Sequence, residues 1–129
     1  MEIKEKNERK ISILVAEDDK EVAASLFNIL SDRNLDVSLS YDGEAALSEL
    51  KKRQFDIMIL DLKLPKVGGF EILAYIKNNE LSTKVIVLTA YSDLKSEKIS
   101  KNLGAEHVMG KPYDIEMLFW AIDMVLSKN

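Results

Sequence analysis

The chain of 129 residues contains no cysteine. Disulfide bonds, zinc sites built on thiolates and thiol-based catalysis are therefore excluded. No apolar run approaches the roughly 18–20 residues that a membrane-spanning helix needs. The N-terminal residues MEIKEKNERK carry charges of both signs without an apolar segment, unlike a secretory signal. These absences predict a cytoplasmic protein that makes no contact with a membrane.

Basic residues are not in excess either. The sequence has 18 Lys and Arg against 22 Asp and Glu, for a formal net charge of −4, whereas a nucleic-acid binder usually shows a basic face. The motifs GxxxxGK[ST] and GxGxxG, which hold phosphates in nucleotide-binding proteins, are absent. We therefore expect no direct partner among nucleic acids and no nucleotide cradle.

Five short runs rich in Val, Ile and Leu are typical of β-strands. They are ISILVA, LDVSLS, FDIMIL, KVIVLT and EHVMG, at residues 11–16, 35–40, 55–60, 84–89 and 106–110. The first, third and fourth runs are almost continuously apolar, as strands buried on both faces of a parallel sheet should be. LDVSLS alternates between apolar and polar residues, which favours an edge strand.

Five segments with helical periodicity lie between and after these runs. They cover residues 20–33, 43–53, 69–79, 93–103 and 114–127. The first should bury one apolar stripe, formed by Val22, Leu26, Ile29 and Leu30. We expect Gly104 to end the fourth helix and Asp114 to cap the fifth.

Strands and helices thus alternate five times with short connections, which predicts right-handed crossovers and a parallel sheet covered on both faces. The expected fold class is α/β, a doubly wound (βα)5 sandwich around a five-stranded parallel sheet. By length this is one domain. Residues 1–9 are expected to form a flexible charged leader, and residues 10–129 the folded domain.

Acidic residues follow the first and third strand runs. Glu17, Asp18 and Asp19 come directly after the first, and Asp61 follows the third. Asp19 alone is explained by solvation or by capping the first helix. Ligands bind beyond the carboxyl ends of such strands. If the first and third strands are neighbours, Asp18 and Asp61 approach each other there, and such a pair requires a cation or a raised pKa. No His or Cys lies nearby in sequence, so the predicted cation is Mg²⁺.

A hydroxyl and an ammonium group should reach the same edge of the sheet. Thr89 closes the fourth strand run and Lys111 follows the fifth. A carboxylate beside Mg²⁺ can itself be a nucleophile that forms an aspartyl phosphate. The metal and Lys111 would then neutralise the charge on the phosphoryl oxygens.

The set AEDD, ILDLKLP followed by GG, VLTAYSD and GKP resembles the receiver domain of two-component response regulators. The resemblance covers about residues 10–127, with the motifs in the family's order. It implies a flavodoxin-like sheet with strand order 2-1-3-4-5. It also implies that residues 10–129 form a receiver domain.

The resemblance implies a role for each matching residue. Asp61 would be the phosphoacceptor, Asp18 a direct Mg²⁺ ligand, and Glu17 a ligand through water. The backbone carbonyl of Lys63 would be a further metal ligand. These assignments predict a magnesium site that includes the phosphoacceptor.

Around the acceptor, Thr89 would bond the phosphoryl group, and Lys111 would pair with a phosphoryl oxygen. The Lys111–Pro112 peptide bond is usually cis in this family. Many members carry Tyr or Phe three residues before this lysine, but this chain has Val108. Val cannot reproduce the rotation of an aromatic ring, so output would depend on the 89–95 loop or on phosphotransfer.

Lys63 and Tyr91 lie two residues beyond the acceptor and the threonine, at positions that flank the entry to the acyl phosphate in the family. With the run KPYDIE, this pair is similar to the single-domain receiver of the sporulation phosphorelay. The resemblance implies a stand-alone receiver that takes a phosphoryl group from a histidine kinase or a histidine phosphotransfer protein. It would relay the group or change its contacts with a downstream protein, in a self-catalysed reaction rather than as an enzyme.

Two other functions remain open at this stage. A receiver-like module could bind partners without phosphorylation, although the intact acceptor, acids, Thr and Lys argue against this. A Mg²⁺-dependent phosphatase with an Asp nucleophile usually carries a second acid two residues after it, where this chain has Lys63.

The last predicted helix carries an apolar group outside its inward stripe. At 100° per residue, Met117, Trp120 and Met124 cluster on the side opposite the stripe. One interpretation is a surface for a partner or a dimer. The other is that neighbouring helices or long charged side chains cover these residues.

Overall fold

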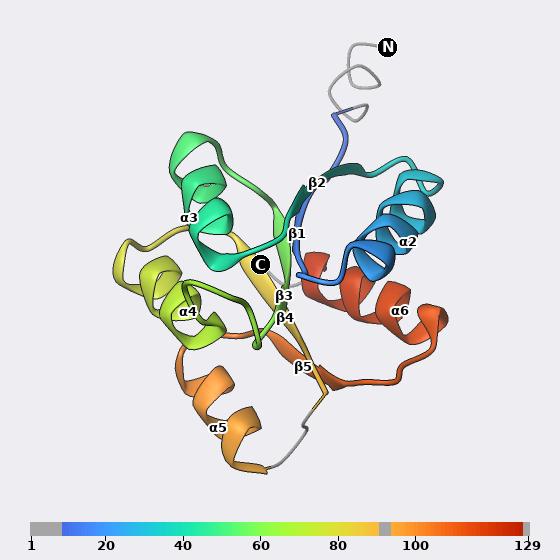
Figure 1. Cartoon of the computed structure of the whole chain (residues 1–129). Coiled ribbons are helices and arrows are strands. Elements are labelled where there is room, and N and C mark those ends of the chain that lie inside the picture. The colour runs from blue at the N-terminus through green and yellow to red at the C-terminus, as the bar shows by residue number, and fades with distance from the viewer. Residues whose placement is uncertain (1–8, 91–93, 128–129) are drawn as a thin grey trace.

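The computed structural model describes residues 9–90 and 94–127, which form a parallel β-sheet between two layers of helices (Figure 1). The strands are β1 (Ser12–Ala16), β2 (Asp36–Ser40), β3 (Ile57–Asp61), β4 (Lys84–Thr89) and β5 (His107–Gly110). The helices are α2 (Lys20–Ser31), α3 (Gly43–Lys52), α4 (Gly69–Asn78), α5 (Leu94–Asn102) and α6 (Ile115–Leu126).

The strand order is β2-β1-β3-β4-β5 and all pairs are parallel, which confirms the α/β fold and the order implied by the resemblance. β2 lies at an edge, as the alternation of LDVSLS predicted. The strand order reverses between β1 and β3, which are neighbours in the sheet. In such sheets a ligand crevice forms beyond the carboxyl ends of the strands at this point.

Alternate residues of the central strands enter two separate cores, one on each face of the sheet. Leu14, Met58 and Val87 pack with α3 and α4, whereas Ile13 and Ile59 face the other core. Figure 1 shows α2 and α6 on one side of the sheet and α3, α4 and α5 on the other. Because the central strands are buried on both faces, their apolar runs are continuous, as the sequence indicated.

The stripe expected on the first helix is partly wrong. Leu26 and Leu30 are buried, but Val22 and Ile29 are each 36% exposed, and Ala23 is buried instead. The buried residues Ala23, Leu26 and Leu30 follow an i, i+3, i+7 spacing, so the buried face of α2 is turned away from Val22 and Ile29. The two exposed residues line a shallow groove together with Tyr113 and Ile115.

The helix ends show which local signals were reliable. The Asp19 carboxylate accepts hydrogen bonds from the backbone N–H groups of Glu21 and Val22, at 3.0 and 3.2 Å, and so caps α2. Gly104, with φ of 101°, follows α5 as expected. Asp114 occupies the cap position of α6, but its side chain makes no capping hydrogen bond. Among the described residues, no helix is long and apolar enough to cross a bilayer.

Candidate functional site

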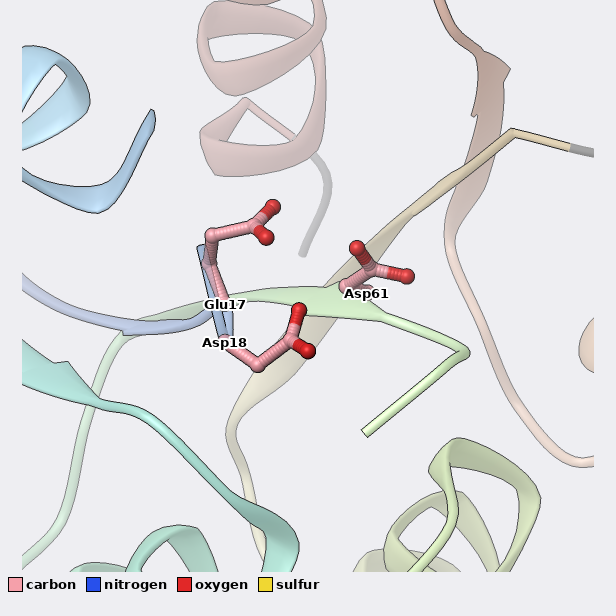
Figure 2. A group of neighbouring side chains, drawn as sticks. All are labelled: Glu17, Asp18 and Asp61. Atoms are coloured by element: carbon pink, nitrogen blue, oxygen red, sulfur yellow. The ribbon is translucent and has the colours of Figure 1, made fainter. Parts of the chain in front are cut away.

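Three carboxylates meet beyond the ends of β1 and β3. Glu17 and Asp18 follow β1, and Asp61 is the last residue of β3 rather than the residue after it. One oxygen from each side chain lies within 4.8 Å of the other two, and Figure 2 shows the three side chains together. Glu17 and Asp61 are only 3% and 7% exposed, whereas Asp18 is exposed to solvent. The predicted approach of Asp18 and Asp61 is therefore confirmed.

Lys111 brings a positive charge to this acidic group. Its Nζ donates a hydrogen bond to Asp61 Oδ2 at 2.8 Å and to Glu17 Oε1 at 3.1 Å. The backbone N–H of Lys111 donates to the carbonyl of Thr89 at 2.8 Å, which ties the segment after β5 to the end of β4. The Lys111–Pro112 peptide bond is cis, as the resemblance implied.

Backbone N–H groups orient two of the carboxylates. The N–H of Lys63 donates to Asp61 Oδ1 at 2.9 Å, and that of Asp19 donates to Glu17 Oε2 at 3.0 Å. Each buried carboxylate thus has one oxygen on a backbone donor and the other on the Lys111 ammonium. These hydrogen bonds stabilise the negative charges of the two carboxylates, which would otherwise be costly to bury.

Burial and neighbouring charges act on the titration of the site. Loss of hydration raises the pKa of Glu17, and the charge of Asp61 adds to this, although Asp19 N–H and Lys111 oppose it. Burial lowers the pKa of Lys111, but its hydrogen bonds to Asp61 and Glu17 outweigh that effect and leave the pKa raised. Lys111 is therefore held as a cation between two carboxylates.

The remaining predicted residues lie around this centre. Thr89 ends β4 and is 4% exposed, and the side chain of Lys63 is exposed while its backbone contacts Asp61. Val108 is half-buried on β5 and packs against the core under α3 and α4. Tyr91 lies outside the described residues.

The sequence pattern of the response regulator receiver domain matches residues 13–123 of the chain. The chain belongs to this family. The receiver domain is 36% identical over 118 residues to the response regulator ArlR of Staphylococcus haemolyticus, covering 92% of this chain and 53% of that protein. It therefore spans about half the length of the curated relatives that it matches.

Solved receiver structures share the fold. The CheY-like receiver protein of Methanospirillum hungatei has a TM-score of 0.86 at 26% identity, with 91% of this chain and 94% of that chain covered. The DrrB receiver domain, described as activated by BeF3, has a TM-score of 0.84 at 29% identity, with 92% and 99% covered. These similarities agree with the observed five-stranded order.

Sequence reasoning missed one contact at the centre of this receiver domain. The bond between Lys111 and Glu17 joins residues 94 positions apart, and no local pattern signals it. It depends on where β5 ends relative to β1, which only the assembled sheet decides. The charges of the two residues were the one available hint.

The carboxylates suit a hard divalent cation. Receiver domains bind Mg²⁺ at an acidic site, and this chain carries the group Glu17, Asp18 and Asp61 there. All three side chains offer oxygen, the ligand that Mg²⁺ and Ca²⁺ prefer. The exposed Asp18 leaves one side of the group open to water and to an incoming anion.

Proposed function

We propose that this receiver domain accepts a phosphoryl group from a phosphohistidine donor onto Asp61 and then relays it or changes its protein contacts. The observation that carries the proposal is the placement of Asp61. Its carboxylate lies within 4.8 Å of two other acids and 2.8 Å from the Lys111 ammonium, at the edge where this fold binds ligands. The chain's family membership supports the same conclusion.

Asp61 is the proposed nucleophile. One of its carboxylate oxygens forms a new O–P bond while the N–P bond of the phosphohistidine breaks, and the electron pair of that bond returns to the imidazole nitrogen of the donor. Lys63 N–H and Lys111 Nζ orient the carboxylate before the reaction, at 2.9 and 2.8 Å. Phosphoryl uptake and later hydrolysis are thus reactions of the protein's own side chain and not turnover of an external substrate.

Mg²⁺ would be held by Asp18 and Asp61, by the backbone carbonyl of Lys63, and by Glu17 through water. When bound, the ion neutralises charge on the phosphoryl oxygens and orients them. The three acids carry more negative charge than the Lys111 ammonium balances, so a divalent cation would compensate the remainder.

Lys111 and Thr89 are the proposed contacts of the phosphoryl group itself. Lys111 already lies 2.8 Å from the acceptor carboxylate, so its ammonium is in place as negative charge arrives. Thr89 is joined to Lys111 through the backbone, which places both residues on the same edge of the sheet.

The proposed donors are a histidine kinase, as the family implies, or a histidine phosphotransfer protein, and the proposed location is the cytoplasm. For a second copy of the chain or a protein partner we propose a surface on α6. Met117 and Trp120 are 52% and 55% exposed there, whereas Met124 is half-buried and packs against the core, so it is dropped from the surface. We call Met117 and Trp120 the α6 surface.

The test is intact mass after incubation with acetyl phosphate, with Mg²⁺ and with EDTA, for the wild type and for Asp61→Asn. We expect one phosphoryl group on the wild type with Mg²⁺ only, and none on Asp61→Asn. Asp18→Asn is a second test, because weaker metal binding should slow uptake while leaving the acceptor intact.

Absence of an adduct, repeated with a histidine kinase as donor, would contradict the proposal and favour a module that binds partners without phosphorylation. Continuous release of inorganic phosphate from a phosphomonoester would instead favour the Mg²⁺-dependent phosphatase.

A further inference from the structure

The loop between β3 and α4, residues 62–68, carries the part of the site that comes from backbone. Its Lys63 N–H holds one oxygen of the Asp61 carboxylate at 2.9 Å. Under the proposed function, the carbonyl of the same residue binds Mg²⁺. The position of this loop therefore decides how the acceptor is oriented and how complete the metal site is.

The far end of the loop lies against the first residue of α3. The N–H of Gly43 donates to the carbonyl of Pro65 at 3.0 Å, and the N–H of Val67 donates to the same carbonyl at 2.8 Å. Lys66, with φ of 73°, lies in the turn between them and pairs with Asp42 at 3.5 Å. The loop is thus bound to the start of α3 by one backbone hydrogen bond and by the Lys66 ammonium, which also pairs with Glu44 at 3.7 Å.

Gly43 is the residue that allows this approach. A Cβ atom at Gly43 would lie 1.9 Å from the carbonyl oxygen of Val67 and 2.6 Å from its carbonyl carbon. Both atoms are backbone, so no side-chain rotation relieves the overlap, and the loop would have to move by about 1 Å to reach a 3.0 Å contact. The φ of Gly43 is outside the left-handed region. Glycine is therefore required by the closeness of Val67 and not by the backbone conformation at residue 43.

The start of the loop, at Leu62, also lies close to a glycine, Gly69 of α4. A Cβ at Gly69 would lie 2.7 Å from Leu62 Cα, and the Gly69 N–H donates to the Leu62 carbonyl at 3.2 Å. Lys63 follows Leu62 directly. Gly43 and Gly69 thus lie against Val67 and Leu62, on either side of Lys63 along the loop.

We infer that Gly43 is a positioning residue for the phosphoacceptor site, because the absence of its Cβ sets where the 62–68 loop, and hence the Lys63 backbone, lies. Gly43 touches none of the reacting groups and acts through the loop. The inference rests on the proposed function, since it concerns the Mg²⁺ site that the loop completes. Helix propensity alone would favour alanine over glycine within α3, so the glycine is explained by this contact.

The experiment compares Mg²⁺ binding by titration calorimetry, without a phosphoryl donor, in the wild type and two single variants. Gly43→Ala should bind Mg²⁺ about tenfold more weakly, as is typical when a group that supports a metal ligand is lost. Gly68→Ala is the matched control in the same loop, because its Cβ would meet nothing closer than Glu71 Oε1 at 4.0 Å. Its affinity should stay within about twofold of the wild type.

A third variant separates positioning from general loss of stability. Leu50→Ala empties core space at the other end of α3, so it should lower the free energy of unfolding while leaving the Mg²⁺ affinity of the folded protein unchanged. Gly43→Ala that folds and binds Mg²⁺ like the wild type would overturn the inference. A wild type that binds no Mg²⁺ would overturn the proposed function instead.

If Gly43→Ala does not fold, hydrogen exchange in the wild type tests the inference instead. Coupling between sites is reciprocal, so a loop that helps to bind Mg²⁺ must itself be held more firmly when Mg²⁺ is bound. Hydrogen exchange at the Gly43 N–H, bonded to Pro65, should slow on adding Mg²⁺ by more than at Ala46 N–H, which bonds to Asp42 within α3. Equal slowing at the two amides would overturn the inference.

Discussion

Glu17 shows how a single residue can oppose folding and still belong to the site. Its carboxylate is 3% exposed, and burial raises its pKa above the ordinary value of 4.5. The ionised form is therefore disfavoured in the fold relative to the unfolded chain. The resulting cost is absent below pH 4.5 and appears as the pH rises through the raised pKa.

Glu17→Gln should consequently stabilise the metal-free protein at neutral pH. Gln keeps one oxygen, which can accept from either the Asp19 N–H or the Lys111 ammonium, and it carries no buried charge. We expect a melting temperature in EDTA at pH 7 that is a few degrees higher, corresponding to about 1 kcal/mol, with the difference closing below pH 4.5. Differential scanning calorimetry measures this.

With Mg²⁺ present, the wild type should instead melt at a higher temperature than Glu17→Gln. Mg²⁺ should raise the melting temperature of the wild type more than that of Glu17→Gln, because the variant lacks one acid of the group. Glu80→Gln, at an exposed acid outside the helices, should match the wild type in both conditions. A metal-free Glu17→Gln that melts at or below the wild type would contradict the argument from burial.

Helix α6 leaves two large apolar side chains exposed, those of Met117 and Trp120. Its inward side, including Leu118, Ile122 and Val125, is buried against β-strand residues. The outward ring of Trp120 meets the edge of His107 on β5, with centroids 5.6 Å apart and the planes at 71°. The α6 surface is thus continuous with β5, the edge strand of the sheet.

Trp120→Arg should weaken contacts made by the α6 surface without affecting the chemistry. Exposed tryptophans at interfaces often contribute 2 kcal/mol or more, so self-association of the phosphorylated protein should weaken at least about tenfold. Sedimentation equilibrium measures this, and intact mass with acetyl phosphate should be unchanged. Phe27→Arg, at an aromatic residue that is 39% exposed on α2, is the matched control.

Self-association and binding of a kinase donor that both remain at wild-type strength in Trp120→Arg would count against the α6 surface. An equal loss in Phe27→Arg would also count against it, because the effect would then follow from added charge rather than from position.

The two ends of the sheet carry different groups of polar residues. The carboxyl ends of the strands hold the acids, whereas the amino ends are joined by Asp56. Its carboxylate accepts hydrogen bonds from Ser12 N at 2.9 Å and Ser12 Oγ at 3.1 Å, and from Arg9, a residue that the sequence placed in the leader. Burial raises the pKa of Asp56, but these donors outweigh it and the pKa is lowered.

Asp56→Asn should therefore destabilise the fold and leave the site intact. A lowered pKa means that Asp56 stabilises above its unfolded pKa of about 3.8, and that this contribution is lost as the pH falls through the lowered value. We expect a loss of about 1–3 kcal/mol at pH 7, shrinking at pH 3, in urea unfolding. Asp36→Asn, which removes an exposed pair with Arg53, should cost less than about 1 kcal/mol.

Equal losses in the two Asp→Asn variants at pH 7 would show that Asp56 behaves as an ordinary surface acid. Phosphoryl uptake by Asp56→Asn should match the wild type, because Asp56 and Asp61 lie at opposite ends of β3.

Much of this architecture was predictable because local patterns carried it. Continuous apolar runs indicated buried parallel strands, and the acids after them indicated the ligand edge. The errors came from packing: Ala23 is buried where Val22 was expected, and Met124 packs partly against the core. Periodicity reports the direction of a side chain but not what lies beside it.

The order of the elements, the oxygen-rich chemistry of the site and its candidate residues could be inferred from residue type and short spacing. Residue type and spacing did not indicate that Lys111 bridges Asp61 and Glu17, or that the backbone of Val67 lies against Gly43. Both contacts join segments far apart along the chain. Their geometry follows from how strands and helices pack, and so no local pattern contains it.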